Sequence, residues 1–397
     1  MKKCALVTLT MAFLMVMVSS YGLAQINGLT NTAKEGSLLI WPKVQTNDGN
    51  ETYIIINNNS PKDVHVQCYW EVKYDRSDPV SQCILDPFVI HIFGNAPVVF
   101  RASDGSSLDG RAVGGAMDIS EKGALKCWAV DPTAGKQISW NHLTGFAIIV
   151  NSDVISTDAK TPPSSAWEYS AWRFAANVID SSGNFADGFW VGAVTDGASS
   201  NVLKLKASPT MIVDPAKCPG PDYTAAGCSL PNAAYDACPK YLTFDFLAEP
   251  SGPSKADGLA FNNLALVPCK EDLIDPSTKI TYTIWNENEV KYMGLYQCAN
   301  CTYETYLGKL AAPRNLKYFQ MKTLHTPSGH LRVQGLASSK CGTDSVSTPL
   351  VGVLSATFRG TQDIYGTTGT TAGKETSDPG YIKYLPEAFD YYQKPKQ

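Results

Sequence analysis

The clearest hydrophobic pattern in the chain is a strict alternation over residues 63–73. Apolar side chains recur at every second position, and polar or amphipathic side chains fill the positions between them. A period of two places the apolar set on one face of a β-strand and the other set on the opposite face. We therefore predict a strand with one buried face and one solvated face. Its apolar set is Val64, Val66, Cys68, Trp70 and Val72.

Two apolar runs precede this strand, at residues 38–42 and 53–56. A cluster of Asn, Asp and Gly at residues 47–50 separates them, and Asn-Asn-Asn-Ser-Pro at residues 57–61 closes the second. Asn and Gly tolerate positive φ, so such clusters between β-branched runs favour hairpin turns. Three strands so close together predict an antiparallel β-sandwich of immunoglobulin-like type. Further strands are expected at residues 88–93, 97–101, 125–130 and 145–150.

The second half of the chain also has the pattern of short strands, which predicts a second, jelly-roll-like β-sandwich. In residues 241–247, apolar residues alternate with Thr243 and Asp245, so these two polar side chains are expected to point outward. Residues 167–178 fit helical spacing and β alternation about equally well, and the pattern does not decide between them. The other expected strands are residues 264–267, 280–285, 331–336 and 350–358.

A polar segment with two adjacent prolines separates the two halves. Proline cannot donate to a β-ladder, so this segment is expected to interrupt the sheet. We therefore predict an all-β chain of two tandem sandwiches. Its parts are a signal peptide at residues 1–24, an immunoglobulin-like sandwich at 25–156, a linker at 157–165, a second sandwich with disulfide-rich loops at 166–360, and a C-terminal arm or tail at 361–397.

The first residues have the pattern of a secretory signal peptide. Two lysines precede an apolar run that is too short to span a bilayer, and small residues lead up to Ala24. Cleavage after Ala24 would place the mature protein in the periplasm or outside the cell. Ten of the eleven cysteines follow this segment, and an even number of thiols in an exported chain indicates a disulfide framework.

The cysteines are unevenly divided between the predicted halves. If all ten pair, at least one bridge must cross the boundary, because each half holds an odd number. The two halves would then not move independently. The first half holds Cys68, Cys83 and Cys127, and the second holds Cys218, Cys228, Cys238, Cys269, Cys298, Cys301 and Cys341.

Composition narrows the class of partner. Only 18% of the residues are charged, the formal net charge is −4, and no basic stripe is present, so a nucleic-acid partner is not expected. No later stretch has the length of a transmembrane helix, so no transmembrane span is expected. The expected partners are an envelope protein or a glycan, and the sequence leaves the oligomeric state open.

One candidate ligand site lies at Trp285, Glu287 and Glu289. If the strand continues through this segment, all three side chains share one face, with two carboxylates near a ring that could stack on a sugar. The alternative is the polar face of an edge strand.

A candidate calcium loop contains Asp180, Asn184 and Asp187 around glycines. Several hard oxygen atoms on a turn suit calcium, although the spacing is not that of an EF-hand. An ordinary Asx-rich turn is the alternative. No other cofactor is expected.

The remaining motifs have structural explanations. Cys298 and Cys301 have redox or zinc spacing, but no βαβ pattern surrounds them, so structural disulfides are expected. His325 and His330 flank a Thr-Pro-Ser-Gly segment and could face each other across a hairpin. No nucleophile elbow, phosphate-binding loop or dinucleotide fingerprint occurs, so no catalytic residue is assigned.

Several segments together resemble an uncharacterised family of exported, cysteine-containing bacterial β-proteins. The resemblance covers most of the mature chain and implies export and β-architecture, with no activity and no catalytic residue to carry over. The segments are residues 37–44, 64–70, 125–131, 140–147, 264–273 and 349–355.

These observations favour a non-enzymatic structural or interaction protein of the cell envelope or the extracellular space. A carbohydrate- or calcium-linked binding module is the first alternative. A secreted hydrolase is the second, and it would require a nucleophile–base pair or separated carboxylates in a concave pocket.

Overall fold

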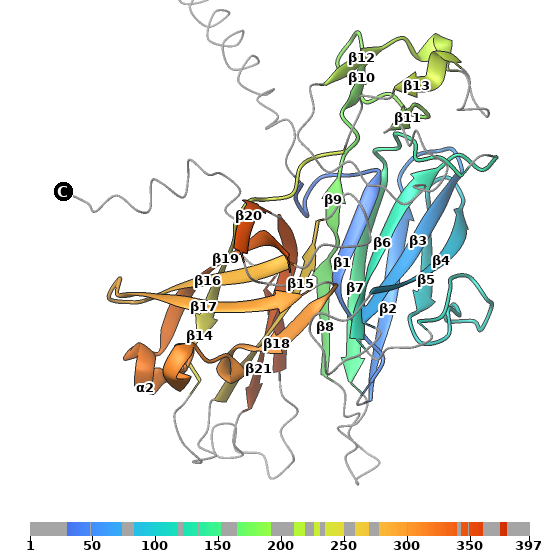
Figure 1. Cartoon of the computed structure of the whole chain (residues 1–397). Coiled ribbons are helices and arrows are strands. Elements are labelled where there is room, and N and C mark those ends of the chain that lie inside the picture. The colour runs from blue at the N-terminus through green and yellow to red at the C-terminus, as the bar shows by residue number, and fades with distance from the viewer. Residues whose placement is uncertain are drawn as a thin grey trace, which may run out of the picture.

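The protein is built almost entirely of β-strands, most of them in antiparallel sheets (Figure 1). The signal peptide, most of the linker, Cys341 and most of the C-terminal arm lie outside the described residues. The computed structural model describes residues 30–47, 49–73, 83–117, 122–133, 135–151, 165–191, 210–218, 226–230, 235–249, 259–269, 278–299, 301–339, 343–347, 349–359 and 374–378.

The first half forms two antiparallel sheets. Sheet I has the strand order β4-β3-β6-β1-β9, and sheet II has the order β5-β2-β7-β8. The strand bounds are β1 Leu38–Gln45, β2 Asn50–Asn58, β3 Val64–Lys73, β4 Cys83–Ile92, β5 Ala96–Arg101, β6 Lys122–Val130, β7 Leu143–Asn151, β8 Ser165–Ser170 and β9 Trp172–Phe174.

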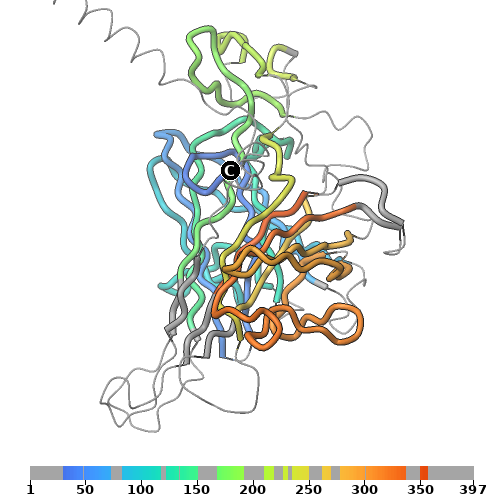
Figure 2. Tube along the Cα trace, turned by 90° about the vertical axis from the view of Figure 1, so that its left-hand side faces the viewer, coloured from blue at the N-terminus to red at the C-terminus, as the bar shows by residue number. Residues whose placement is uncertain are grey.

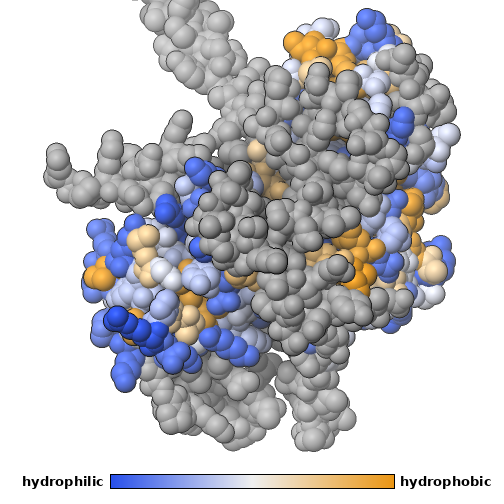
Figure 3. Space-filling model, in the orientation of Figure 1, coloured by the Kyte–Doolittle hydropathy of each residue, from blue (hydrophilic) through white to orange (hydrophobic). Residues whose placement is uncertain are grey.

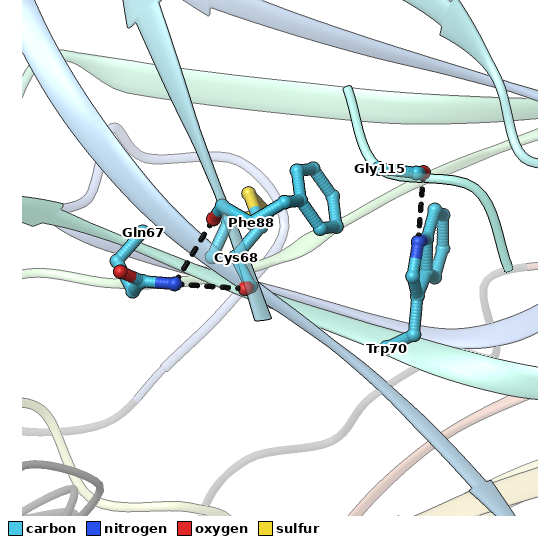
Figure 4. Close-up of a disulfide and its surroundings, with 6 residues drawn as sticks. Gln67, Cys68, Trp70, Phe88 and Gly115 are labelled. Atoms are coloured by element: carbon cyan, nitrogen blue, oxygen red, sulfur yellow. Dashed lines mark hydrogen bonds between the residues drawn. A yellow bond between two sulfur atoms is a disulfide. The ribbon is translucent and has the colours of Figure 1, made fainter. Parts of the chain in front are cut away.

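Sheets I and II share a buried apolar core. Trp41 and Trp70 of sheet I and Ile54 and Phe100 of sheet II are buried in it together. Cys68 and Cys127, directly opposite each other on β3 and β6, form a disulfide within sheet I. Around this bridge, Trp70 donates its indole N–H to the carbonyl of Gly115, and the amide of Gln67 donates to two backbone carbonyls (Figure 4).

The alternation in β3 is confirmed on one face only. Its apolar set is buried as predicted, with exposures of 0–3%. The opposite face is not fully solvated: Glu71 is buried in an ion pair with Lys126 of β6, and Tyr69 stacks on Trp128. The prediction failed there because sheet I packs on both faces, and Trp128 belongs to a second core.

The predicted hairpins at residues 47–50 and 57–61 are wrong in their pairing. β1 and β3 belong to sheet I and β2 belongs to sheet II, so both turns carry the chain from one layer to the other. Turn chemistry is present, since the N–H of Asn50 donates to the carbonyl of Asn47. Local turn residues specify a reversal of the chain but not which sheet receives the next strand.

Residues 165–174 are strands and complete the first half. β8 pairs with β7 in sheet II, and β9 pairs with β1 in sheet I. These strands therefore belong with the sheets that precede the proline-containing segment, and the first layered unit extends to Phe174 rather than ending at residue 156. β7 and β8 are neighbours in sheet II, so the chain is in the same sheet at residue 151 and again at residue 165.

The second half forms two further antiparallel sheets. Sheet III has the order β14-β19-β16-β17, with β20 pairing to β19, and sheet IV has the order β18-β15-β21-β22. The bounds are β14 Leu242–Leu247, β15 Leu259–Pro268, β16 Thr278–Asn286, β17 Lys291–Ala299, β18 Tyr303–Tyr306, β19 Ser328–Ser339, β20 Thr343–Ser347, β21 Leu350–Arg359 and β22 Lys374–Asp378, with short helices η4 Leu307–Lys309, η5 Pro313–Asn315 and α2 Met321–Leu324.

All the strands predicted in this half are present. In β14, Leu242, Phe244 and Phe246 are buried and Asp245 is exposed as expected. Leu247 is exposed, and Thr243, opposite Arg332 of β19 in the register, is buried rather than solvated. β22 falls within the predicted C-terminal arm and pairs with β21, so this part of the arm is docked on sheet IV.

A smaller region connects the two halves. It contains two short parallel ladders, β10 with β12 and β11 with β13, and the Cys218–Cys228 disulfide. The Cys238–Cys269 disulfide ties the start of the second half to the end of β15. The bounds are β10 Val178–Asp180, β11 Trp190–Val191, β12 Met211–Val213 and β13 Ser229–Leu230, with η2 Pro215–Lys217 and η3 Ala226–Cys228.

The two halves lie side by side, as both views of the chain show (Figures 1 and 2). One apolar core runs through both of them: Leu38 and Trp128 of sheet I are buried in the same cluster as Phe244 and Leu331 of sheet III. The indole N–H of Trp172 donates to the carbonyl of Gly352 on β21 at 3.0 Å. The two halves therefore share one hydrophobic core.

The predicted bridge between the halves is confirmed. Cys83, at the start of β4, is bonded to Cys301, just before β18. Four disulfide pairs are described, and Cys298 is also disulfide-bonded. Within the described residues, no helix has the length and apolar character needed to cross a membrane.

Candidate functional site

The best candidate for a binding surface is the outer face of sheet III. The register places four side chains in one row across its strands: Asp245 on β14, His330 on β19, Trp285 on β16 and Lys291 on β17. Inward-facing residues of the same strands belong to the shared core, so this row lies on the opposite face.

Arg332 lies between two aromatic rings on this face. It is two residues beyond His330 on β19, and its guanidinium carbon is 4.7 Å from the ring centre of Tyr241 and 5.7 Å from that of Trp285. Burial lowers the pKa of Arg332, and Tyr241 opposes the shift. An arginine side chain remains cationic at neutral pH even so. Both rings lie within the range of a cation–π contact with the guanidinium.

Lysines add further positive charge beside the rings. The ammonium of Lys291 lies 5.6 Å from the ring centre of Trp285, and that of Lys279 lies 4.9 Å from the ring centre of Tyr296. Each is within the range of a cation–π contact. We call the set Tyr241, Trp285, Lys291, His330 and Arg332 the Trp285 platform.

The row has a histidine–carboxylate contact at its other end. Nδ1 of His330 lies 2.7 Å from a carboxylate oxygen of Asp245, and the His330 ring is tilted against Trp285 with ring centres 6.0 Å apart. Asp245 thus fixes the orientation of the imidazole that flanks Trp285. The surface of this lobe is mainly hydrophilic with small hydrophobic patches (Figure 3).

The predicted grouping of Trp285, Glu287 and Glu289 on one strand face is wrong. β16 ends at Asn286, whose side-chain oxygen accepts the N–H groups of Asn288 and Val290 and so closes a turn. Glu289 has a positive φ of 62° in that turn, and Glu287 accepts a hydrogen bond from Ser328. A local Asn-capped reversal ended the strand before the carboxylates could align.

The three residues of the candidate calcium loop do not converge. Asp180 accepts the N–H groups of Ser182 and Asn184 and thereby caps its own turn. These contacts lower the pKa of Asp180. Asp187 lies 2.8 Å from Nε2 of His142 instead. The segment is an Asx-rich turn, which was the alternative expected from the sequence.

His325 and His330 do not face each other. His325 ends α2 with a left-handed φ of 61° and is exposed, whereas His330 lies on β19 against Asp245. The short helix α2 places the first histidine away from the strand, and the sequence pattern did not predict this helix.

Cys298 and Cys301 are not partners of each other. Cys301 is bonded to Cys83, and Cys298 is disulfide-bonded as well, so neither forms a Cys-x-x-Cys redox pair. The structural explanation expected from the sequence is confirmed for both. Among the described residues, no group of three or more His, Cys, Asp and Glu is arranged to hold a metal ion.

Sequence reasoning found Trp285 but missed Arg332, Tyr241 and Lys291. Lys291 begins β17, Arg332 lies on β19, and Tyr241 directly precedes β14, so the pairing of these strands with one another brings the three side chains to Trp285. The alternation within each strand was the only available signal. It predicts which face of the sheet a side chain lies on, but not which residues of neighbouring strands lie beside it.

The chain was compared with known proteins. No protein-family model matches it, and no curated protein matches it. The resemblance to exported bacterial β-proteins therefore stays an expectation from the sequence.

Proposed function

We propose that this chain is an exported, non-enzymatic interaction protein of the cell envelope, and that it binds an acidic glycan on the Trp285 platform. The observation that carries the proposal is the row of cations and aromatic rings across sheet III. We also retain the expected classes, immunoglobulin-like for the first half and jelly-roll-like for the second. The immunoglobulin-like class is supported by the two facing antiparallel sheets of the first half. The Cys68–Cys127 disulfide does not support it, because this bond lies within one sheet, whereas the disulfide of antibody domains joins the two sheets.

Charge favours an anionic ligand over a neutral one. Arg332 and Lys291 both lie against Trp285, while Asp245 is the one carboxylate that the register places in the row. A carboxylate-bearing sugar would meet the N–H donors of Arg332 and the ammonium of Lys291, and charge-assisted hydrogen bonds of this kind are the stronger ones. The exposed ring of Tyr296 nearby provides apolar surface for the sugar ring.

Rigidity supports a binding role. Sheet III packs into the apolar core that it shares with sheet I, and a rigid platform avoids part of the ordering cost of association. Export is supported by the disulfides, because such bonds persist in oxidising compartments.

The test is a titration of the exported protein with polygalacturonate and with neutral dextran of similar length. We expect binding to polygalacturonate only, weakening as salt screens the charges. The double variant Lys291→Gln with Arg332→Gln should weaken binding by about tenfold or more, equivalent to about 1.4 kcal/mol. Lys136→Gln is the matched control, because Lys136 makes a similar contact, with Trp190, in another part of the protein.

Equal binding of both polymers, or wild-type affinity in the double variant, would contradict the proposal. Release of new reducing ends from the polymer would instead support a secreted hydrolase.

A further inference from the structure

A pair of histidines lies on the face of sheet I opposite the first core, outside the Trp285 platform. His65 of β3 and His91 of β4 are directly opposite in the antiparallel register. Their rings are stacked, with centres 4.7 Å apart and planes 28° from parallel. Both side chains retain contact with solvent, and the His91 side chain is 39% exposed.

Asp63 holds the second imidazole in place. One of its carboxylate oxygens lies 3.3 Å from Nε2 of His91, and the other accepts the N–H of Gly94 at 2.9 Å. A carboxylate on one ring nitrogen is the usual support for a histidine that binds a metal through its other nitrogen. Asp63 faces Nε2 of His91, so Nδ1 is the nitrogen that would bind a metal.

Two carboxylates lie near the histidine pair. Burial and the neighbouring His91 lower the pKa of His65, and the carboxylates of Asp63 and Asp131 oppose that shift. Asp131 is itself fixed, since it accepts the N–H of Thr133. Metal–imidazole bonds are about 2.0–2.1 Å long, so two nitrogens on one ion lie about 3–4 Å apart. Stacked rings direct their lone pairs side by side, so both imidazoles would have to turn about their side-chain bonds to meet on one ion.

We propose that His65 and His91 form a two-imidazole site for a divalent transition-metal ion, with Cu²⁺ bound more tightly than Zn²⁺. Water molecules complete the coordination, since two imidazoles are the protein ligands. The order of affinity follows the general preference of nitrogen sites for copper. A site with two protein ligands binds more weakly than a closed structural site, so we expect micromolar affinity for Cu²⁺.

The first experiment is a titration of the untagged, exported protein with CuCl₂, followed by electron paramagnetic resonance at one equivalent of metal. We expect hyperfine coupling from two imidazole nitrogens. His91→Asn and His65→Asn should each weaken binding by about tenfold or more. His325→Asn is the matched control: His325 is exposed with a left-handed backbone, which asparagine tolerates, and this variant should bind Cu²⁺ as the wild type does.

Thermal unfolding provides a second readout. Saturating Zn²⁺ should raise the melting temperature of the wild type and of His325→Asn, because a ligand that binds only the folded state stabilises it. The increase should be lost in His91→Asn, whose more exposed side chain makes misfolding a lesser concern than for His65. Wild-type copper affinity in both histidine variants, or a spectrum without two imidazole nitrogens, would overturn the proposal.

Discussion

Cys83 and Cys301 are 218 residues apart in the sequence and are joined by a disulfide that links the two halves of the protein. Cys83 begins β4 of sheet I, and Cys301 directly precedes β18 of sheet IV. Three residues after Cys301, Glu304 enters a cluster of polar side chains from the first half. Covalent, apolar and polar contacts thus coincide along one interface, and the halves behave as one unit.

Removal of the Cys83–Cys301 disulfide tests how much it contributes to the stability of the two joined halves. We expect Cys83→Ser with Cys301→Ser to lower the free energy of unfolding by about 2–5 kcal/mol, because the bridge closes a very long loop. Guanidinium unfolding of the oxidised protein measures the change. The matched control is Cys218→Ser with Cys228→Ser, which opens a short loop of sequence separation 10 and should cost less. A larger loss in the control would contradict the interpretation.

Glu304 is the centre of the polar contacts between the halves. Its Oε1 accepts hydrogen bonds from Gln45 at 2.7 Å and Asn263 at 2.8 Å, and lies 3.9 Å from the buried ammonium of Lys43. The ammonium also donates to the hydroxyl of Ser355 at 3.0 Å. Glu304→Gln removes the negative charge beside the buried ammonium, and breaking a buried ion pair costs about 3–5 kcal/mol.

Lys122→Gln provides the comparison for Glu304→Gln. Lys122 lies 3.5 Å from Glu304, but its side chain is 40% exposed, so the loss should be below about 1 kcal/mol. Urea unfolding of both variants gives the two values. Equal losses would show that burial of Lys43 is not what makes Glu304 important.

His142 makes part of the stability dependent on pH. Its Nε2 contacts Asp187 at 2.8 Å, and Glu35 lies 3.8 Å from its other nitrogen, so the pKa of His142 is raised, chiefly by the hydrogen bond to Asp187. A raised folded-state pKa gives a contribution that is complete below the unfolded-state pKa of about 6.5 and is lost as the pH rises through the folded-state pKa.

We therefore expect His142→Asn to cost more stability at about pH 5.5 than at about pH 8.5. Urea unfolding of the wild type and the variant at both pH values measures the two differences. A loss that is the same at both pH values, or larger at the higher one, would contradict the assignment.

Gly145 tests the packing of the first core. A methyl group at this position would lie 2.4 Å from Cζ2 of Trp41 and 3.1 Å from the carbonyl of Ile55. We expect Gly145→Ala to destabilise the protein by about 1–3 kcal/mol, as overpacking does. In a Trp41→Leu background the cost should fall, and a double-mutant cycle of thermal unfolding measures the coupling. If the losses of stability from the two substitutions simply add, a clash with Trp41 is not what makes Gly145→Ala destabilising.

Much of the fold could be predicted from local pattern. The alternation in residues 63–73 predicted the buried face of β3, and the odd cysteine counts predicted a bridge between the halves, which Cys83–Cys301 provides. Both predictions depend on quantities that the sequence contains directly, namely the side-chain period and the number of thiols.

Other features depend on which elements meet in space. The face of β3 that was expected to be solvated is half-buried, because a second core packs against sheet I. Nothing in residues 63–73 predicts which other part of the chain packs on that face. The platform around Trp285 needs the register of four strands, and Arg332 gains its role only from that register. The strand does not continue through Glu287 and Glu289, because Asn286 closes the turn with its own side chain.

The measurement that tests the account most directly is peptide mapping of the exported protein without reduction, combined with counting of free thiols. We predict a cross-linked pair of peptides containing Cys83 and Cys301, and no free thiol among the ten cysteines of the mature chain. Recovery of Cys83 and Cys301 as free thiols, or bonded only within their own halves, would contradict the central claim that the two halves form one covalently linked unit.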